Sequence, residues 1–269
     1  MESSLADGGK CWSKPPVIKS PLARVCLILI VATYTVFAIR SFQINVERII
    51  YGIDRAGEMF GAFLRPDFLA RKHYIVQGVL ESMAMTVVAT GVGVFLSIPL
   101  FLGAARNISP RPVYRLCRLL LVVFRSLHVV ILAILFVIMF GFGPFAGVLT
   151  LIVNTVGFLG KLVAEDIESI SEETLEAIRS TGASWPQLVV YGVWPQIATR
   201  FTGLVIYRGD QSFRQSTVIG LVGAGGIGAV LETAMGRYDY NTAGAILLVI
   251  IILVLVGEYA SSAVRRRLV

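Results

Sequence analysis

Long apolar runs alternate with short polar segments along this chain, and the alternation is the first guide to its structure. A helix that spans a membrane needs roughly 20 mostly apolar residues. Four runs plainly meet that requirement: 22–39, 75–104, 116–140 and 243–264. A fifth run, 145–163, contains Asn154 and several glycines but has no charge before Lys161. These five runs predict transmembrane helices.

A sixth run, 188–222, is apolar enough to span a membrane, but charged residues interrupt it. The interrupting residues are Arg200, Arg208, Asp210 and Arg214. We interpret this run as a transmembrane helix that begins near Pro195. The predicted fold class is therefore an all-α integral membrane protein with six transmembrane helices.

Composition supports a membrane protein and argues against several other classes. Of the 269 residues, 56% are hydrophobic and only 15% are charged, whereas soluble domains carry about 25% charged residues. The formal charge of +7 could suggest nucleic-acid binding, but the basic residues cluster at the ends of apolar runs, as expected of residues that set membrane topology. Three scattered cysteines and two histidines indicate neither a disulfide framework nor a metalloenzyme.

The distribution of Lys and Arg predicts that both termini are cytoplasmic. Basic residues gather in the N-terminal tail 1–21, in the loop after the second predicted span and in the C-terminal tail 263–269. With six spans these three segments lie on one side of the membrane. The loop 40–74 is then external, and its helical periodicity predicts an amphipathic helix on the outer surface. The region 76–262 holds the other five spans.

The charges of the fifth span have two interpretations. Asp210 and Arg214 are four residues apart, so they can pair on one helical face and leave Arg208 as a surplus positive charge. Intramembrane charges usually face a cavity or a partner, which would place these residues on a transport path for an anion. The alternative is that they lie at the outer membrane surface and extend to water.

A polar segment between the fourth and fifth spans predicts a short cytoplasmic helix. Ser171 begins it, and acidic residues in its first turn suit the helix dipole. Gly182 lies just past the apolar periodicity, where it can end the helix. The segment then continues to a proline, Pro195, at the entrance of the fifth span.

The sequence EAIRSTGASWPQLVVYGVWPQ, from 176 to 196, resembles the cytoplasmic signature of permease subunits of binding-protein-dependent ABC importers. Glu176, Ala177 and Gly182 match this signature, and Trp194–Pro195 stands where the family has Leu-Pro. The resemblance implies a type I ABC importer permease fold with a cytoplasmic coupling helix that seats on the ATPase subunit. The residues implied in ATPase coupling are Glu176, Ala177, Gly182 and Pro195.

Within these importers the chain is most similar to phosphonate and phosphite permeases, over roughly 76–262. The likeness is carried by that signature, by VLESMAMTVVATGVGVFLSIPLFLGAARN and by YRGDQSFRQSTVIGLVGAGGIG. Ser212 stands within the departure from the family pattern after Arg208, where short side chains would reshape the path. The implied path residues are Arg208, Asp210, Ser212 and Arg214. His128 stands where relatives have proline, so we expect the usual kink to be absent and His128 to be packed or polar-paired rather than a proton relay.

The last segment, 223–228, reads GAGGIG and fits the glycine spacing of a dinucleotide-binding loop, but the strand–turn–helix context is missing. We interpret it as an external turn before the last span whose backbone N–H groups are available to an anion. Its glycines are Gly223, Gly225, Gly226 and Gly228.

The resemblance implies a membrane-spanning permease that carries a small phosphorus oxyanion across the inner membrane and catalyses no reaction itself. Its expected partners are two ABC ATPase subunits, a periplasmic substrate-binding protein, a second copy of itself and the lipid bilayer. We expect no cofactor on this chain, because ATP and Mg²⁺ are used by the ATPase. Two alternatives stay open: the same machine with a methionine or metal-chelate cargo, and a secondary transporter, although no internal repeat is evident.

Overall fold

The computed structural model describes residues 21–41, 46–69 and 71–268, and in these ranges every regular element is a helix. The chain divides into two units, Met1–Gly57 and Glu58–Val269. The first unit contains α1 (Pro21–Ser41) and most of α2 (Val46–Phe63). The tails 1–20 and 269, to which part of the topology prediction refers, lie outside the described residues.

Helices α1 and α2 differ in the way their apolar residues are distributed. Helix α1 is apolar all round and contains a candidate membrane span, Arg24–Ser41. Helix α2 begins with an acidic first turn at Glu47 and places its apolar residues on one side, as an amphipathic helix does. The helix expected in 40–74 is therefore present, and its location on the outer membrane surface stays a prediction.

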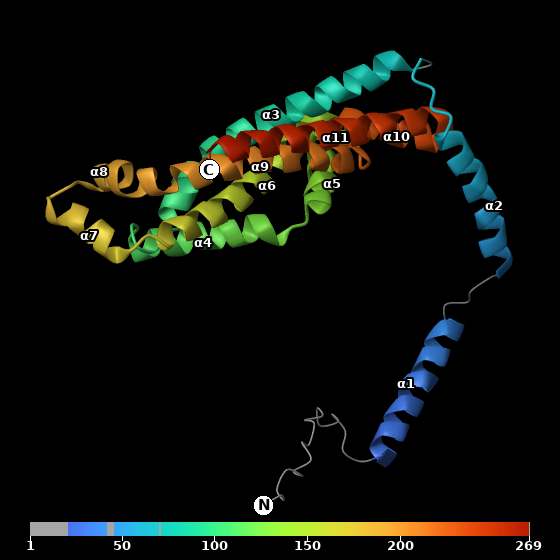
Figure 1. The fold of residues 1–269 in the computed structure, drawn as a ribbon, viewed down its shortest axis with the longest axis horizontal. Helices are drawn as coiled ribbons and strands as arrows, with labels where there is room; N and C mark the ends of the chain where they lie inside the picture. Colours follow the sequence, from blue (N-terminus) through green and yellow to red (C-terminus); the bar gives the residue numbers. More distant parts are fainter. Residues whose placement is uncertain (1–20, 42–45, 70, 269) are drawn as a thin grey trace, which may run out of the picture. The chain divides into compact units, whose positions relative to one another are not determined.

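The second unit is a bundle of long helices (Figure 1). Its elements are α3 (Lys72–Gly103), α4 (Arg111–Ser126), α5 (Val129–Phe140), α6 (Pro144–Glu168), α7 (Glu172–Ser180), α8 (Trp185–Gln187), the π-helical η1 (Leu188–Val193), α9 (Trp194–Gly220), α10 (Gly226–Gly236) and α11 (Tyr240–Leu268). Helices α3, α6, α9 and α11 run lengthwise through the unit. Helices α7 and α8 stand at one end, and α10 lies towards the other.

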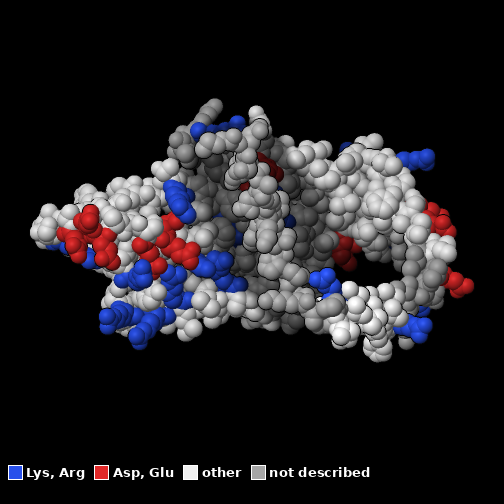
Figure 2. Space-filling model, turned by 60° about the horizontal axis from the view of Figure 1, so that its bottom comes forward, with Lys and Arg blue, Asp and Glu red and all other residues white. Residues whose placement is uncertain are grey.

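Side-chain polarity changes along this unit. The long helices expose large apolar side chains over much of their surface, which suits contact with lipid. Acidic and basic side chains gather at the end that carries α7 (Figure 2). The charged residues of α7 and of the start of α4 contribute there: Glu172, Glu173, Glu176, Arg111 and Arg115. The charged end is therefore the part of this unit best suited to water.

Four described helices are long and apolar enough to cross a membrane, or five if the bent pair α4 and α5 forms one span. Helix α9 is not among them, because it carries four charged residues. It begins at Trp194, as the sequence predicted. The count of six spans is not confirmed by length and composition, and it stays a prediction.

The third predicted span is broken, which corrects two expectations. Helices α4 and α5 meet at an angle of 89°, so 116–140 is not one straight helix, and the kink expected to be absent is present. Leu127 and His128 adopt extended backbone angles at the break. The Nδ1 atom of exposed His128 accepts a hydrogen bond from the N–H of Val130 at 3.4 Å and caps α5. A capping side chain thus accompanies the bend without a proline.

The glycine-rich segment is largely buried, which corrects the expectation that its backbone is exposed, and its location on the external side stays a prediction. It joins α9 to α10, so α10 separates it from the last apolar helix. Residues 225–228 are buried, and the N–H of Ile227 donates to the Ser82 hydroxyl at 2.9 Å. A Cβ atom on Gly228 would lie 2.0 Å from the Thr217 carbonyl oxygen. These glycines therefore allow close backbone packing, and the buried residues 225–228 are shielded from an anion in solution.

Candidate coupling helix and anion-binding cavity

The predicted coupling helix is α7. Ser171 is its N-cap residue, and Glu172 and Glu173 occupy its first turn. The helix ends before Gly182, whose φ of +80° is a backbone conformation that glycine adopts at no steric cost. A Cβ atom on Gly182 would meet nothing within 4 Å, so glycine is required here by backbone conformation and not by crowding.

One face of α7 packs against η1, and the opposite face is open. Leu175 is only 1% exposed, and the side chains of Leu175 and Ile178 both lie against Gly192 in η1. Glu176 and Ala177, which match the family signature, are exposed. Their side chains are therefore available to a partner protein while the helix is held by its apolar side. Pro195 lies in the first turn of α9, at the far end of η1.

Most of the charges of α9 are paired with charges in the same chain. The Nε atom of Arg200 lies 2.8 Å from a carboxylate oxygen of Asp166 in α6. Arg214 pairs with Asp210, as their spacing predicted, and its Nη1 atom lies 3.8 Å from Glu258 in α11. The pair formed by Asp210 and Arg214 thus lies near α11.

Arg208 is different because its partners are neutral. It is 1% exposed and lies near the middle of α9, so it does not extend to water in this chain. Its Nε atom donates to the Thr155 hydroxyl at 3.0 Å, and its Nη2 atom donates to the side-chain oxygens of Asn154 at 2.6 Å and Gln215 at 3.0 Å. Its guanidinium carbon lies 5.5 Å from the centroid of the Phe158 ring. Among the described residues, no carboxylate forms an ion pair with Arg208, and its Nη1 atom forms no hydrogen bond.

Arg208 lines a cavity of about 240 Å³ at the break between α4 and α5. The lining residues come from the break, from α6 and from α9: Phe124, Arg125, Leu127, His128, Val129, Asn154, Phe158, Arg208, Gln211 and Gln215. None of these carries a carboxylate. The buried Oε1 atom of Gln211 has no hydrogen-bond partner within the described part of the chain. The cavity therefore combines the buried positive charge of Arg208 with the amide of Gln211, which can turn to donate its N–H groups to a small anion.

The structure separates the predicted path residues. Only Arg208 lines the cavity; Asp210 and Arg214 lie by α11, and Ser212 is fully buried with its hydroxyl unpaired in the described region. Sequence reasoning did not assign Asn154, Thr155, Gln211 and Gln215 to the site. The sequence feature that could have identified them is a polar side chain within an apolar span, because such a group needs a hydrogen-bond partner there.

The chain belongs to a family of transport proteins. Residues 91–269 match the model of the family described as binding-protein-dependent transport system inner membrane component. The chain is thus a membrane subunit of a transport system, which confirms the resemblance found in its coupling signature.

Two relatives whose names state a transport function extend this result. The chain is 36% identical over 224 residues to the phosphite transport system permease protein PtxC of Stutzerimonas stutzeri, covering 83% of this chain and 81% of the relative. It is 34% identical over 258 residues to the phosphate-import permease protein PhnE of Mycolicibacterium smegmatis, covering 96% of this chain and 48% of the relative. The chain therefore spans about half the length of the second relative.

Solved structures confirm the type I ABC importer permease fold. A chain of the methionine ABC transporter MetNI in an inward-facing conformation matches with a TM-score of 0.64 and 25% identity, covering 75% of this chain and 99% of that chain. A chain of an amino acid ABC transporter with histidines matches with a TM-score of 0.61 and 19% identity, covering 75% of this chain and 98% of that chain.

Proposed function

We propose that this chain is the permease subunit of an ABC importer for a small phosphorus oxyanion of the phosphonate, phosphite or hypophosphite class. The observation that carries the proposal is Arg208, a buried guanidinium held only by neutral side chains at the edge of a polar cavity. A buried charge without a counter-ion is costly unless a ligand supplies one. The names of the phosphite and phosphate relatives support the same class of cargo.

Recognition in the cavity would be mainly electrostatic. The free Nη1 atom of Arg208 offers two N–H donors, and charge-assisted bonds to an oxyanion are stronger than neutral ones. Amides such as Gln211 can donate to the remaining oxygens or accept from a protonated one. The break between α4 and α5 opens the space for the anion, since five lining residues come from that region.

Coupling to ATP hydrolysis would proceed through α7. Its exposed residues Glu176 and Ala177 would seat on an ABC ATPase subunit, and its buried face would pass the movement to η1 and α9. ATP and Mg²⁺ would bind to that partner and not to this chain. An external substrate-binding protein would deliver the anion to the opposite side of the membrane.

The importer would contain two copies of this chain. Each copy has one coupling segment, whereas the relative PhnE is about twice as long as the region it shares with this chain. Two copies related by a two-fold axis would supply two coupling helices for two ATPase subunits. In each copy the C-terminal end of α11 lies towards the end of the unit that carries α7 and α8, which supports a cytoplasmic C-terminus (Figure 1).

Methionine is the second candidate cargo, because a methionine transporter shares the fold. The cavity disfavours it, since the ammonium group of an amino acid would lie close to the Arg208 guanidinium and no carboxylate lines the space to offset that repulsion. A cationic metal chelate would be disfavoured as well, because the positive charge of Arg208 would repel it.

The test is uptake into proteoliposomes that contain the complete complex with its ATPase subunits and its own binding protein. Phosphite, hypophosphite, methylphosphonate, sulfate and methionine are compared at equal concentration. We expect ATP-dependent uptake of at least one phosphorus oxyanion and none of methionine. Uptake of methionine without that of any phosphorus oxyanion would contradict the proposed cargo.

A further inference from the structure

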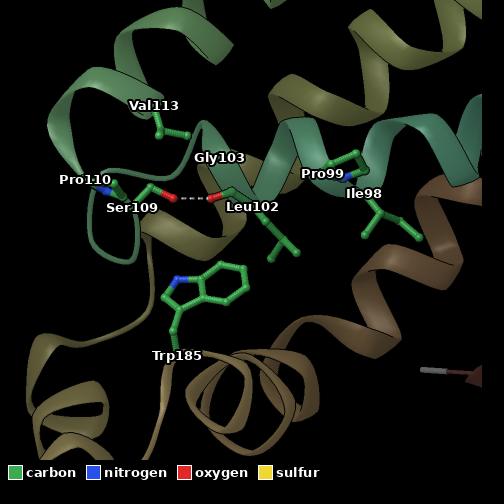
Figure 3. Close-up of a pocket in the computed structure, with 8 residues that line it drawn as sticks. All are labelled: Ile98, Pro99, Leu102, Gly103, Ser109, Pro110, Val113 and Trp185. Atoms are coloured by element: carbon green, nitrogen blue, oxygen red, sulfur yellow. Dashed lines mark hydrogen bonds between the residues drawn. The ribbon is translucent and has the colours of Figure 1, made fainter.

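The loop between α3 and α4 (residues 104–110, called here the α3–α4 loop) is held together by its own hydrogen bonds. The Ser109 hydroxyl donates to the Leu102 carbonyl at 2.7 Å, and the Ser109 N–H donates to the Ala105 carbonyl at 3.2 Å. The first of these bonds is drawn in Figure 3. Because the loop is internally bonded, a displacement of its middle will be passed to the ends of α3 and α4.

The loop is also fixed to the end of α6. The Arg106 N–H donates to the Glu168 carboxylate at 2.9 Å, and Arg118 of α4 donates to the same carboxylate at 2.7 Å. The Asn107 side-chain amide donates to the Ile167 carbonyl at 2.7 Å. The α3–α4 loop thus joins the ends of three helices at the charged end of the bundle.

Two side chains connect this loop to the coupling segment (residues 172–187, comprising α7, the Gly182 turn and α8). The Nη2 atom of Arg179 donates to the Asn107 carbonyl at 2.6 Å. The Nε1 atom of Trp185 donates to the Ile108 carbonyl at 2.9 Å. Arg179 and Trp185 stand three residues before and three residues after Gly182, and their acceptors are consecutive carbonyls. The turn is therefore tied to the loop on both of its sides.

Packing alone does not hold Trp185 in place. Its side chain faces an apolar cavity of about 360 Å³ at the corner between α3 and α4, next to Leu102 and Pro110 (Figure 3). The residue is 48% exposed although it is a tryptophan. Because about half of the residue is exposed, the indole N–H bond adds a directional contact to this limited packing and helps to fix where the ring lies.

We propose that Arg179 and Trp185 are positioning residues that clamp the coupling segment to the α3–α4 loop, so that its movement drives α3 and α4. This inference rests on the proposed function, in which the ATPase moves α7. Two attachment points on either side of a glycine turn prevent the turn from rotating freely. A push on α7 therefore reaches α3, α4 and the end of α6, in addition to η1 and α9.

The test compares Arg179→Gln, Trp185→Phe and the double variant in the complete complex. Trp185→Phe keeps an aromatic ring and removes the N–H donor, while Arg179→Lys retains a charged donor as the conservative variant. Matched controls are Arg115→Gln, an exposed arginine of α4, and Tyr74→Phe, an exposed aromatic residue at the opposite end of α3 from the α3–α4 loop. The readouts are phosphite taken up per ATP hydrolysed and the distance distribution between spin labels at Arg111 and Ser180.

With both bonds lost, we expect the double variant to keep its ATPase subunits and its ATP hydrolysis while uptake per ATP falls about tenfold. We also expect the spin-label distance distribution to broaden, with Arg179→Lys and both controls close to the wild type. An unchanged distance distribution in the double variant would overturn the clamp. A broadened distribution with unchanged uptake per ATP would show that the clamp exists but does not transmit movement, which would overturn the proposed role. A wild-type complex that hydrolyses ATP but takes up none of the phosphorus oxyanions contradicts the cargo alone. The spin-label comparison with and without ATP and vanadate still decides the clamp in that case.

Discussion

Replacing Gln215 with glutamate tests directly whether the cavity needs an unpaired positive charge. The Gln215 side-chain oxygen lies 3.0 Å from the Nη2 atom of Arg208. Gln215→Glu keeps the size of the side chain and turns this neutral partner into a permanent counter-ion. Many substitutions that abolish activity also lower the stability of the fold, whereas this one adds an ion pair with Arg208. Loss of transport therefore cannot be attributed to loss of a structural contact with Arg208.

The size of the effect follows from the charges. Two opposite unit charges at about 4 Å interact by about 4 kcal/mol at an effective dielectric constant of about 20. In the Gln215→Glu variant, an incoming anion would lose most of the attraction of Arg208 and would also be repelled by the introduced carboxylate. Part of this energy is offset by desolvation of that carboxylate. Since about 1.4 kcal/mol changes an equilibrium tenfold, we expect anion uptake to fall by at least about 100-fold.

The assay is initial-rate uptake of phosphite by the complete complex in proteoliposomes, with assembly checked by size-exclusion chromatography. Gln77→Glu is the matched control, because Gln77 is an exposed glutamine of α3 that does not line the cavity. The control should transport at a rate close to the wild type. If Gln215→Glu assembles and transports like the control, the Arg208 cavity does not bind the anion.

Three further predictions concern coupling, packing and assembly. Gly182→Val should uncouple ATP hydrolysis from uptake, since valine disfavours the φ of +80°, whereas Gly182→Asn should be tolerated, as a ratio of uptake to hydrolysis will show. Gly228→Ala should lower the melting temperature in detergent, at a cost of about 1–3 kcal/mol or more, because its Cβ meets backbone at 2.0 Å; Gly91→Ala, with open space, should not. Native mass spectrometry should find two copies of this chain per complex, and one copy beside a different permease would refute the homodimer.

Much of the fold could be predicted from the sequence because it depends on local patterns. Apolar runs of sufficient length gave α3, α6 and α11, and the capping pattern around Ser171 and Gly182 placed α7 within a residue or two. The expectation of no kink at His128 was wrong, because it assumed that only a proline would bend the chain there. A histidine side chain that accepts from the Val130 N–H caps a new helix at this position without a proline. Such a cap depends on the side-chain rotamer, which the sequence does not specify.

The candidate site could be predicted only in part. The spacing of Asp210 and Arg214 correctly predicted their pair and left Arg208 as the surplus charge. The acceptors Asn154 and Thr155 lie more than 50 residues before Arg208 and are brought to it by the packing of α6 on α9. The cavity itself exists because two helices diverge at a break. These features depend on tertiary contacts between helices, which a pattern along one helix does not contain.

In the proposed importer, the position of Arg208 lets one movement both open the path and alter the affinity for the anion. Arg208 lies 14 residues after the start of α9, which corresponds to about 21 Å along a helix axis. The start of α9 is joined through η1 to the buried face of α7, and π-helical turns within helices are frequent at functional sites. The other wall of the cavity is the break between α4 and α5, and α4 is attached to the α3–α4 loop. A displacement of the coupling segment would therefore reach both walls, by η1 and α9 on one side and by the Arg179 and Trp185 bonds on the other. The anion-binding geometry would then change whenever those two routes move the walls by unequal amounts.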